Sequence, residues 1–452
     1  MGRGRASRAW AERLATALGI ACVSATAKAD PHLQAVGETS IGYTDNFRNT
    51  PESALVAGPP RATGAFLTLS PSVVLALESQ RAVQRVSYRY EYDLFLAQTT
   101  ASGSTNQVDY HGFFELSPRL TMLLDSSASE TNRYAAVAFS APAASTVAGL
   151  PAGTGAFAQG NASASLNYDM APSWRGWQSA NALVESPILG TSAPQTSEVQ
   201  ARTGVERSFL SNSAGLELRP DYTVVRNTVA PNGSPAGTQE QLVVNGVALW
   251  RHDWGRDFTS SAEAGAARVQ RFNTGRGFWT PTGSLLFAFA NQSGDAQLSY
   301  AHAVSTNALL GQTLLADEVR VRGGLPLTPD NRLLLAVTAG YERGRLIDES
   351  ANLAARVATA DGDVTLGFQA TKLLELALKY QHIQQVSDAA APPLPLSFTQ
   401  NNVLASAIFK FPPDRDMPRP YRAPLRIDRS DEIRDGAEAA PELEKETQVP
   451  TQ

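Results

Sequence analysis

The sequence predicts an all-β fold, a transmembrane antiparallel up-and-down β-barrel of about eighteen strands, with sixteen as the alternative. Segments in which apolar and polar residues alternate recur along most of the chain, and the connections between them alternate between short and long. After the N-terminal region, no stretch reaches the roughly eighteen apolar residues of a membrane helix. A barrel needs only alternate residues to be apolar, so the hydrophobic content of 43% is sufficient for it.

The clearest alternation lies at residues 82–98. One parity carries Val86, Tyr88, Tyr90, Tyr92 and Leu94, and the other carries Arg85, Ser87, Arg89, Glu91 and Asp93. Successive side chains of a strand point to opposite faces, so one face is apolar and the other is charged. At about 3.3 Å per residue the segment can cross an apolar band of roughly 25 Å. We predict that it runs outward from the periplasm with its tyrosines towards lipid.

The other alternating segments follow in order, and the second contains a proline. They are 33–43, 62–78, 108–116, 120–125, 162–170, 174–185, 197–208, 213–227, 239–251, 257–271, 278–291, 295–306, 316–327, 331–344, 355–370, 373–386 and 398–411. Pro71 removes a ladder donor, which predicts either a turn or a bulge in one long strand. We prefer the bulge, because a turn would shift the parity and move the long loops to the periplasmic rim. The last segment ends in Phe411, as terminal barrel strands usually end in an aromatic residue.

The connections indicate the membrane and the orientation. Short turns are expected at 79–81, 117–118, 171–173, 292–294, 328–330 and 371–372, and longer loops at 44–61, 98–106, 130–158, 186–196, 228–238, 345–354 and 387–397. One tight rim and one elaborated rim are typical of a barrel in the bacterial outer membrane, with outer-membrane lipid around it. The 130–158 loop is long enough to fold inward and constrict a pore.

The two ends of the chain are expected to lie outside the barrel, which takes residues 30–411. Residues 1–29 read as a signal peptide, with arginines before an apolar stretch and Ala27-Lys28-Ala29 at the cleavage site. A lipoprotein signal through Cys22 is the weaker alternative. Cys22 is the only cysteine, so the mature chain is expected to hold no disulfide and no thiolate metal site. Residues 412–452 are proline-rich and charged, which predicts a disordered periplasmic tail.

The charged parity of the strands predicts the lining of the lumen. Its members are Arg85, Arg89, Glu91, Asp93, Asp109, His111, Glu115, Arg119, Arg202, Glu206, Arg219, Arg320, Arg322 and Lys379, together with Arg175, Glu185, Glu198, Glu217, Asp221, Glu318 and Glu375. Charges of both signs would hold water without the single-sign field of a strongly ion-selective pore. An equally good interpretation is that many of them pair across strands and brace the wall.

Tryptophans and tyrosines near strand ends predict an interfacial girdle. The residues near predicted strand ends are Trp174, Trp177, Trp250, Trp254, Trp279, Tyr300 and Tyr341. Trp177 and Trp279 are assigned to the lumen parity, where an indole ring could stack on a sugar.

Enzymatic chemistry is not expected. The best catalytic candidate is His111, on one strand face with Asp109 and Glu115 and with Asp125 on the next strand, but mixed charge inside a barrel is ordinary. The sequence carries no nucleophile elbow, phosphate-binding glycine loop or zinc signature, so no cofactor and no metal are predicted. A net charge of -5 indicates no nucleic-acid partner. We expect no plug domain, so a periplasmic partner would be a separate chain.

Three short motifs resemble a family of Gram-negative outer-membrane β-barrels found with exopolysaccharide-export and exosortase-type loci. They are Gly42-Tyr43-Thr44-Asp45-Asn46, Leu69-Ser70-Pro71 and Leu116-Ser117-Pro118-Arg119, and the resemblance covers most of residues 33–411. It implies a porin-like conduit for secretion of a polysaccharide, working with a separate periplasmic polysaccharide-export protein. The alternatives are a general diffusion porin for small solutes and, from another class, an outer-membrane enzyme or a structural barrel.

Overall fold

A computed structural model describes residues 30–46, 63–96, 102–131, 157–187, 195–229, 235–255, 257–273, 275–291, 293–307, 312–346, 356–387 and 397–412. The expected signal peptide, nearly all of the expected tail and most of the 130–158 loop lie outside these residues. In the part of the chain that the structure describes, no helix is long and apolar enough to cross a bilayer.

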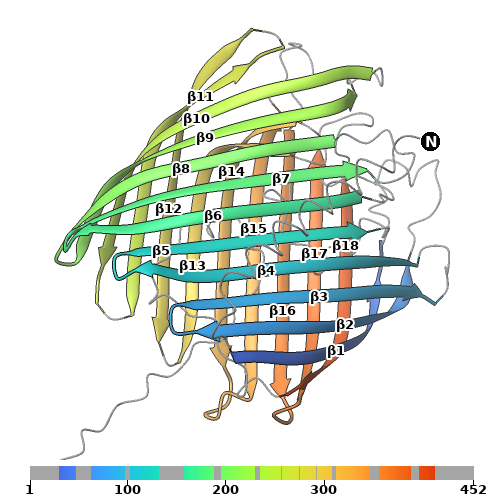
Figure 1. The fold of residues 1–452 in the computed structure, drawn as a ribbon. Coiled ribbons are helices and arrows are strands. Elements are labelled where there is room, and N and C mark those ends of the chain that lie inside the picture. The colour runs from blue at the N-terminus through green and yellow to red at the C-terminus, as the bar shows by residue number, and fades with distance from the viewer. Residues whose placement is uncertain are drawn as a thin grey trace, which may run out of the picture.

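Eighteen antiparallel strands form one sheet that closes on itself (Figure 1). Each strand pairs with its neighbours in sequence, and β1 pairs with β18 to close the barrel. The strands are β1 (Asp30–Thr44), β2 (Gly64–Ser79), β3 (Ala82–Phe95), β4 (Gly103–Ser117), β5 (Leu120–Thr131), β6 (Phe157–Ala171), β7 (Trp174–Pro187), β8 (Gln195–Phe209), β9 (Asn212–Val229), β10 (Pro235–Asp253), β11 (Phe258–Arg271), β12 (Gly277–Asn291), β13 (Gly294–Asn307), β14 (Gln312–Pro326), β15 (Leu333–Leu346), β16 (Arg356–Gln369), β17 (Leu374–Ser387) and β18 (Phe398–Phe411). The predicted fold class and strand number are confirmed.

The two faces of the wall follow the alternation along each strand. On β3, Glu91 and Asp93 are buried, whereas Tyr88 is 46% exposed on the opposite face. Side chains on strands two apart, such as Trp177 of β7 and Glu217 of β9, converge on the concave side of a closed sheet and diverge on its convex side. The concave side is the inner face. The outer face carries the exposed apolar side chains of most strands, and it includes Tyr88, as predicted for β3.

The two rims differ as the sequence predicts. Most even-numbered strands pass to the next odd-numbered strand through a short turn, as at Ser79 and Ala82, whereas most odd-numbered strands lead into a longer connection; the connection from β14 to β15, which is longer than that from β13 to β14, is an exception. We call these edges the short-turn rim and the long-loop rim. Both chain ends of the sheet lie at the short-turn rim. An apolar outer face with this asymmetry is that of an outer-membrane barrel, which crosses the membrane with its strands.

Strand β2 has no bulge at Pro71, so the prediction of a bulge was wrong. It is continuous, and its register to β1 is the same on either side of the Gly37–Pro71 pair. Only the pairing with β3 is interrupted: Leu69 pairs with Tyr92 and Ser72 with Arg89, but the two residues between do not pair. Proline has no N–H to donate to the ladder, so the strand loses its hydrogen bonds to β3 locally. It does not contain the extra residue that defines a bulge.

The Gly42–Asn46 segment fastens the closing seam between β1 and β18. Asp45 accepts two hydrogen bonds from Asn401, one at Oδ1 from the backbone N–H (2.7 Å) and one at Oδ2 from Nδ2 (2.6 Å). Asn46 Nδ2 donates to the Thr399 carbonyl at 2.9 Å. A side chain at Gly42 would overlap Leu404 and the Phe66 ring, which crosses the strand at this point. The motif therefore has a structural role at the seam.

Candidate functional site

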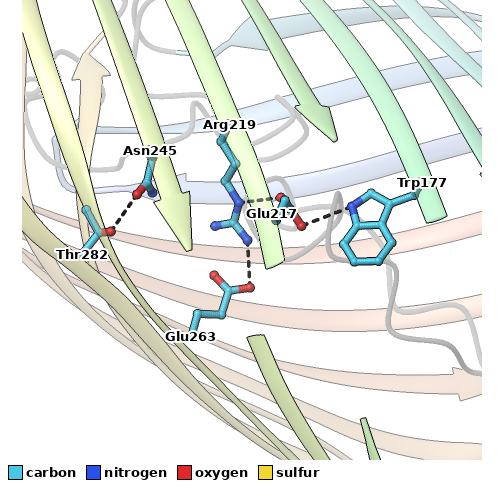
Figure 2. A network of polar contacts seen from close by, with 6 residues as sticks. All are labelled: Trp177, Glu217, Arg219, Asn245, Glu263 and Thr282. Carbon is cyan, nitrogen blue, oxygen red and sulfur yellow. Dashed lines mark hydrogen bonds and ion pairs between the residues drawn. The ribbon is translucent and has the colours of Figure 1, made fainter. Parts of the chain in front are cut away.

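A network of polar side chains lies on the inner face across strands β7 to β12 (Figure 2). Arg219 stands between two carboxylates: its Nε donates to Glu217 Oε1 at 2.5 Å and its Nη2 to Glu263 Oε1 at 2.8 Å. Trp177 Nε1 donates to the other Glu217 oxygen at 3.2 Å. Beside them, Thr282 Oγ1 donates to Asn245 Oδ1 at 2.9 Å. We call Trp177, Glu217, Arg219 and Glu263 the wall network.

The strand register explains why Trp177 reaches Glu217. Gly204 of β8 pairs with Trp177 on one side and with Glu217 on the other, so the three residues form one row across the sheet. A Cβ atom at Gly204 would overlap the Trp177 ring. Because glycine leaves this space empty, the indole crosses β8 and its N–H meets the carboxylate on β9.

Burial makes the wall network rigid. The side chains of Glu217, Glu263 and Arg219 are 1%, 7% and 15% exposed, respectively. Hydrogen bonds between ionised partners are shorter and stronger than neutral ones, and each weakly hydrated charge needs its partner. Both Glu217 oxygens are occupied, so the carboxylate holds the guanidinium and the indole at the same time. The network thus offers a fixed aromatic ring beside a charge-neutralised arginine.

Charges elsewhere on the inner face also pair within and between strands. Arg320 and Glu318 lie 2.9 Å apart on β14, and Lys379 Nζ lies 4.0 Å from Asp363 on the neighbouring strand. Asp221 accepts hydrogen bonds from Gln200 of β8 (3.4 Å) and from Thr223 (3.3 Å). These contacts support the bracing interpretation of the inner charges.

Most residues predicted to line the lumen occupy positions of their strands that face the inside of the barrel. These are Arg85, Arg89, Glu91, Asp93, Asp109, His111, Glu115, Arg202, Glu206, Arg219, Arg320, Arg322 and Lys379. Their contact with a passing solute remains a prediction. The structure adds Glu263, Asp361 and Asp363, which the sequence did not single out. Strand β11 has small residues on both parities, so its alternation gave no clear signal for Glu263.

Arg119 is not on the wall. It lies in the turn between β4 and β5, where it is exposed and its carbonyl accepts the Asp169 N–H at 2.9 Å. A register shift between Glu115 and Ser117 ends the regular alternation before the turn. The prediction was wrong because it extended the strand parity through Pro118.

Trp279 is on the outer face. It is 68% exposed and shares its parity with Leu285 and Phe287, which are also exposed. Arg268 lies opposite it on β11, with the guanidinium carbon 5.7 Å from the indole centroid. The predicted sugar-stacking role in the lumen is therefore wrong for Trp279. Its place near the long-loop rim is that of a girdle residue.

His111 forms an ion-pair contact with Asp125, its partner across β4 and β5. The two side chains are 42% and 47% exposed. The nearby Ser87 hydroxyl donates to Asp109 Oδ2 at 3.4 Å and not to the imidazole. Among the residues with described positions, no group of histidine, cysteine, aspartate and glutamate could hold a metal ion. This geometry is that of a hydrogen-bonded histidine–aspartate pair on the wall.

No protein-family model matches the sequence, and no curated protein matches it. Among solved structures, the chain is similar to the outer-membrane protein OpdK from Pseudomonas aeruginosa, with 11% identity and a TM-score of 0.43 over 84% of this chain and 99% of that one. OccK2 (OpdF) from the same organism, solved with glucuronate, has 11% identity and a TM-score of 0.44 over 84% and 98%. OccAB3 from Acinetobacter baumannii has 9% identity and a TM-score of 0.43 over 84% and 100%. The fold assignment itself stands on the strand pairing.

Proposed function

We propose that the chain forms a passive channel for small polar solutes through the bacterial outer membrane. The observation that carries the proposal is an inner face with charges of both signs in a closed barrel of eighteen strands. Barrels of this strand number leave an aqueous lumen, whereas barrels of about eight strands are filled by their own side chains. Lumen-facing side chains then set which solutes pass.

The paired charges of the inner face give little preference for ions of either sign. Arg219 lies between two carboxylates, which outnumber its single positive charge, and Arg320 is paired with Glu318, so neither arginine presents an uncompensated positive field. A wall of this kind gives weak charge selectivity. The Trp177 ring, fixed by its hydrogen bond to Glu217, offers an apolar platform on which the C–H face of a sugar ring can stack.

Substitution of Trp177 tests the proposal in vesicles that contain the purified chain. We expect wild-type vesicles to swell in isosmotic glucose and in an acyclic polyol of similar size. Trp177→Ala should change the ratio of the two swelling rates by about threefold, because only the cyclic sugar can stack on the ring. Trp177→Phe keeps an aromatic platform and is the matched control, so its ratio should stay near the wild-type ratio. If wild-type vesicles swell in neither solute, the result would contradict the proposal that the chain forms a channel.

Polysaccharide secretion with a separate periplasmic export protein is the second candidate, and it rests on the three short motifs. Of the two tryptophans expected to contact sugar, only Trp177 lies on the inner face, so the support for a continuous sugar track is weaker than for a channel. Deletion of the gene with measurement of surface polysaccharide separates the two candidates. Unchanged polymer output together with loss of small-solute uptake would favour the channel.

A further inference from the structure

Strands β12 and β13 pair along only part of their length. Their ladder runs from the short-turn rim to the pair of Gly283 and His302, and it stops there. The structure describes residues 277–282 of β12 and 303–307 of β13 as strand, yet these two stretches do not pair with each other. Each of them stays paired on its other side, to β11 and to β14. We call this separation, which is about 16 Å long at 3.3 Å per residue, the β12–β13 split.

The sequence gives a reason for the split at Pro281. Proline has no N–H to donate, so it interrupts a ladder. Pro71 and Pro220 also interrupt the pairing with one neighbouring strand, but there the pairing resumes after two residues. At Pro281 it does not resume, although both strands continue towards the long-loop rim. The split is thus larger than the local defect that a proline causes elsewhere in the wall.

Apolar side chains close the split in place of the ladder. Val243, Val269 and Phe278 form one row across β10, β11 and β12. Phe278 and, from β13, Val304 both pack against the buried side chains of Val243, Ala267 and Val269. We call these five residues the apolar cluster. It joins the two strand ends through side-chain contact.

The position of Val304 shows that the two strand ends overlap. Val269 shares its parity with Glu263 of the wall network, so the row to which it belongs is on the inner face. Val304 shares its parity with Tyr300, which is exposed on the outer face. An outer-face residue of β13 can contact this row only if the end of β13 lies against the inner side of β11 and β12. Val269 is 0% exposed, as expected of a side chain between two such layers.

We propose that the β12–β13 split is a lateral gate through which a single-chain amphiphile with an uncharged head group passes between the lumen and the outer leaflet. Opening leaves the ladder up to Gly283 intact, and a hydrocarbon chain can replace the contacts that Val304 gives up. Asn245 and Thr280 lie in one row beside the apolar cluster on the inner face, where an amide and a hydroxyl suit an uncharged polar head group. Trp279, a girdle residue of the outer face, lies within the split and places it at the level of the outer leaflet. The gate is independent of which small solutes cross the lumen.

A reversible cross-link across the split tests the gate in the full chain, folded in lipid nanodiscs and carrying Cys22→Ser. Thr282→Cys and Ala303→Cys occupy the first positions beyond the ladder, and a short bifunctional methanethiosulfonate joins them. The probe is dodecyl glucoside with a photoreactive diazirine in its chain, used below its solubilising concentration. Without the cross-link, light should label peptides that contain Phe278 and Val304, and unlabelled dodecyl glucoside should compete whereas glucose should not. The cross-link should lower this labelling about tenfold, because it removes the open state, and a reductant should restore it.

Ala303→Cys with Ala316→Cys is the matched control, because it joins the same β13 residue to its direct partner on β14. Its cross-link should leave the labelling unchanged. A second variant keeps the test decisive if the cysteine pair across the split does not fold. Val304→Ala removes part of the apolar contact that holds the split closed, so labelling of the Phe278 peptide should rise about threefold. Equal labelling with and without the cross-link across the split, or no rise in Val304→Ala, would overturn the proposal.

Discussion

Replacing Arg219 by alanine should lower the free energy of unfolding by about 3 kcal/mol. The substitution leaves Glu217 and Glu263 without their shared cation, although their side chains are only 1% and 7% exposed. Taking away one partner of a buried ion pair is costly because the remaining charge has lost both its partner and its water. Urea titration of the chain folded into lipid vesicles measures the change. The folded fraction at each urea concentration is read from the shift in gel mobility that heating causes.

Arg320→Ala is the matched control for Arg219→Ala. Arg320 also bonds an acid two residues away on its own strand, but that acid, Glu318, is 34% exposed and keeps access to water. Asp361 also attracts Arg320, but the hydrogen-bonded partner of Arg320 is partly hydrated, so the substitution should cost only about 1 kcal/mol. A loss of stability in Arg219→Ala no greater than in Arg320→Ala would contradict the description of the wall network as a buried unit.

Replacing Asp45 by alanine should open the closing seam at the long-loop rim. Asp45 accepts two hydrogen bonds from Asn401, and its own N–H donates to the Asn401 carbonyl at 3.2 Å. Loss of the charged acceptor should cost about 2 kcal/mol, since hydrogen bonds to charged groups are among the stronger ones. Hydrogen exchange of the Asn401 amide should then become roughly thirtyfold faster, because the seam opens locally at lower free energy.

Asp45→Asn provides the control for the seam. Its amide oxygen can still accept one hydrogen bond from Asn401, so exchange at the Asn401 amide should lie between wild type and Asp45→Ala. Amides on β9, far from the seam around the barrel, should exchange as in wild type. Unchanged exchange of the Asn401 amide in Asp45→Ala would show that closure does not depend on Asp45.

Strong alternation made the barrel predictable from sequence. On β3 apolar and polar residues alternate without exception from Val86 to Leu94, and the structure keeps this alternation between the two faces without a register shift. The rule failed where local geometry interrupts it. At Arg119 the turn begins earlier than the alternation of the strand suggests. At Pro71 the missing N–H interrupts the pairing with β3, but no extra residue is inserted into the strand. Period and composition do not determine these details, which depend on the ladder of the neighbouring strand.

The wall network and the seam could not be predicted, because they join residues that are distant in sequence. Asp45 and Asn401 are separated by 356 positions and meet only once the barrel closes. Trp177 meets Glu217 because the register of β7, β8 and β9 places Gly204 between them. The sequence identified Trp177 and Arg219 as inner-face residues. Which residues they contact depends on how each strand is staggered against the next.

Single-channel recording with introduced cysteines tests most directly whether the inner face lines a water-filled channel. Cys22 is the only cysteine of the chain, so a Cys22→Ser background isolates each new thiol. Arg202 lies on the inner face of β8 and its neighbour Ala201 on the outer face. We predict discrete conductance steps for both variants, with a charged, water-soluble thiol reagent lowering the current through Arg202→Cys and leaving Ala201→Cys unchanged. Absence of steps, or an equal response of the two variants, would contradict a solute channel bounded by this face.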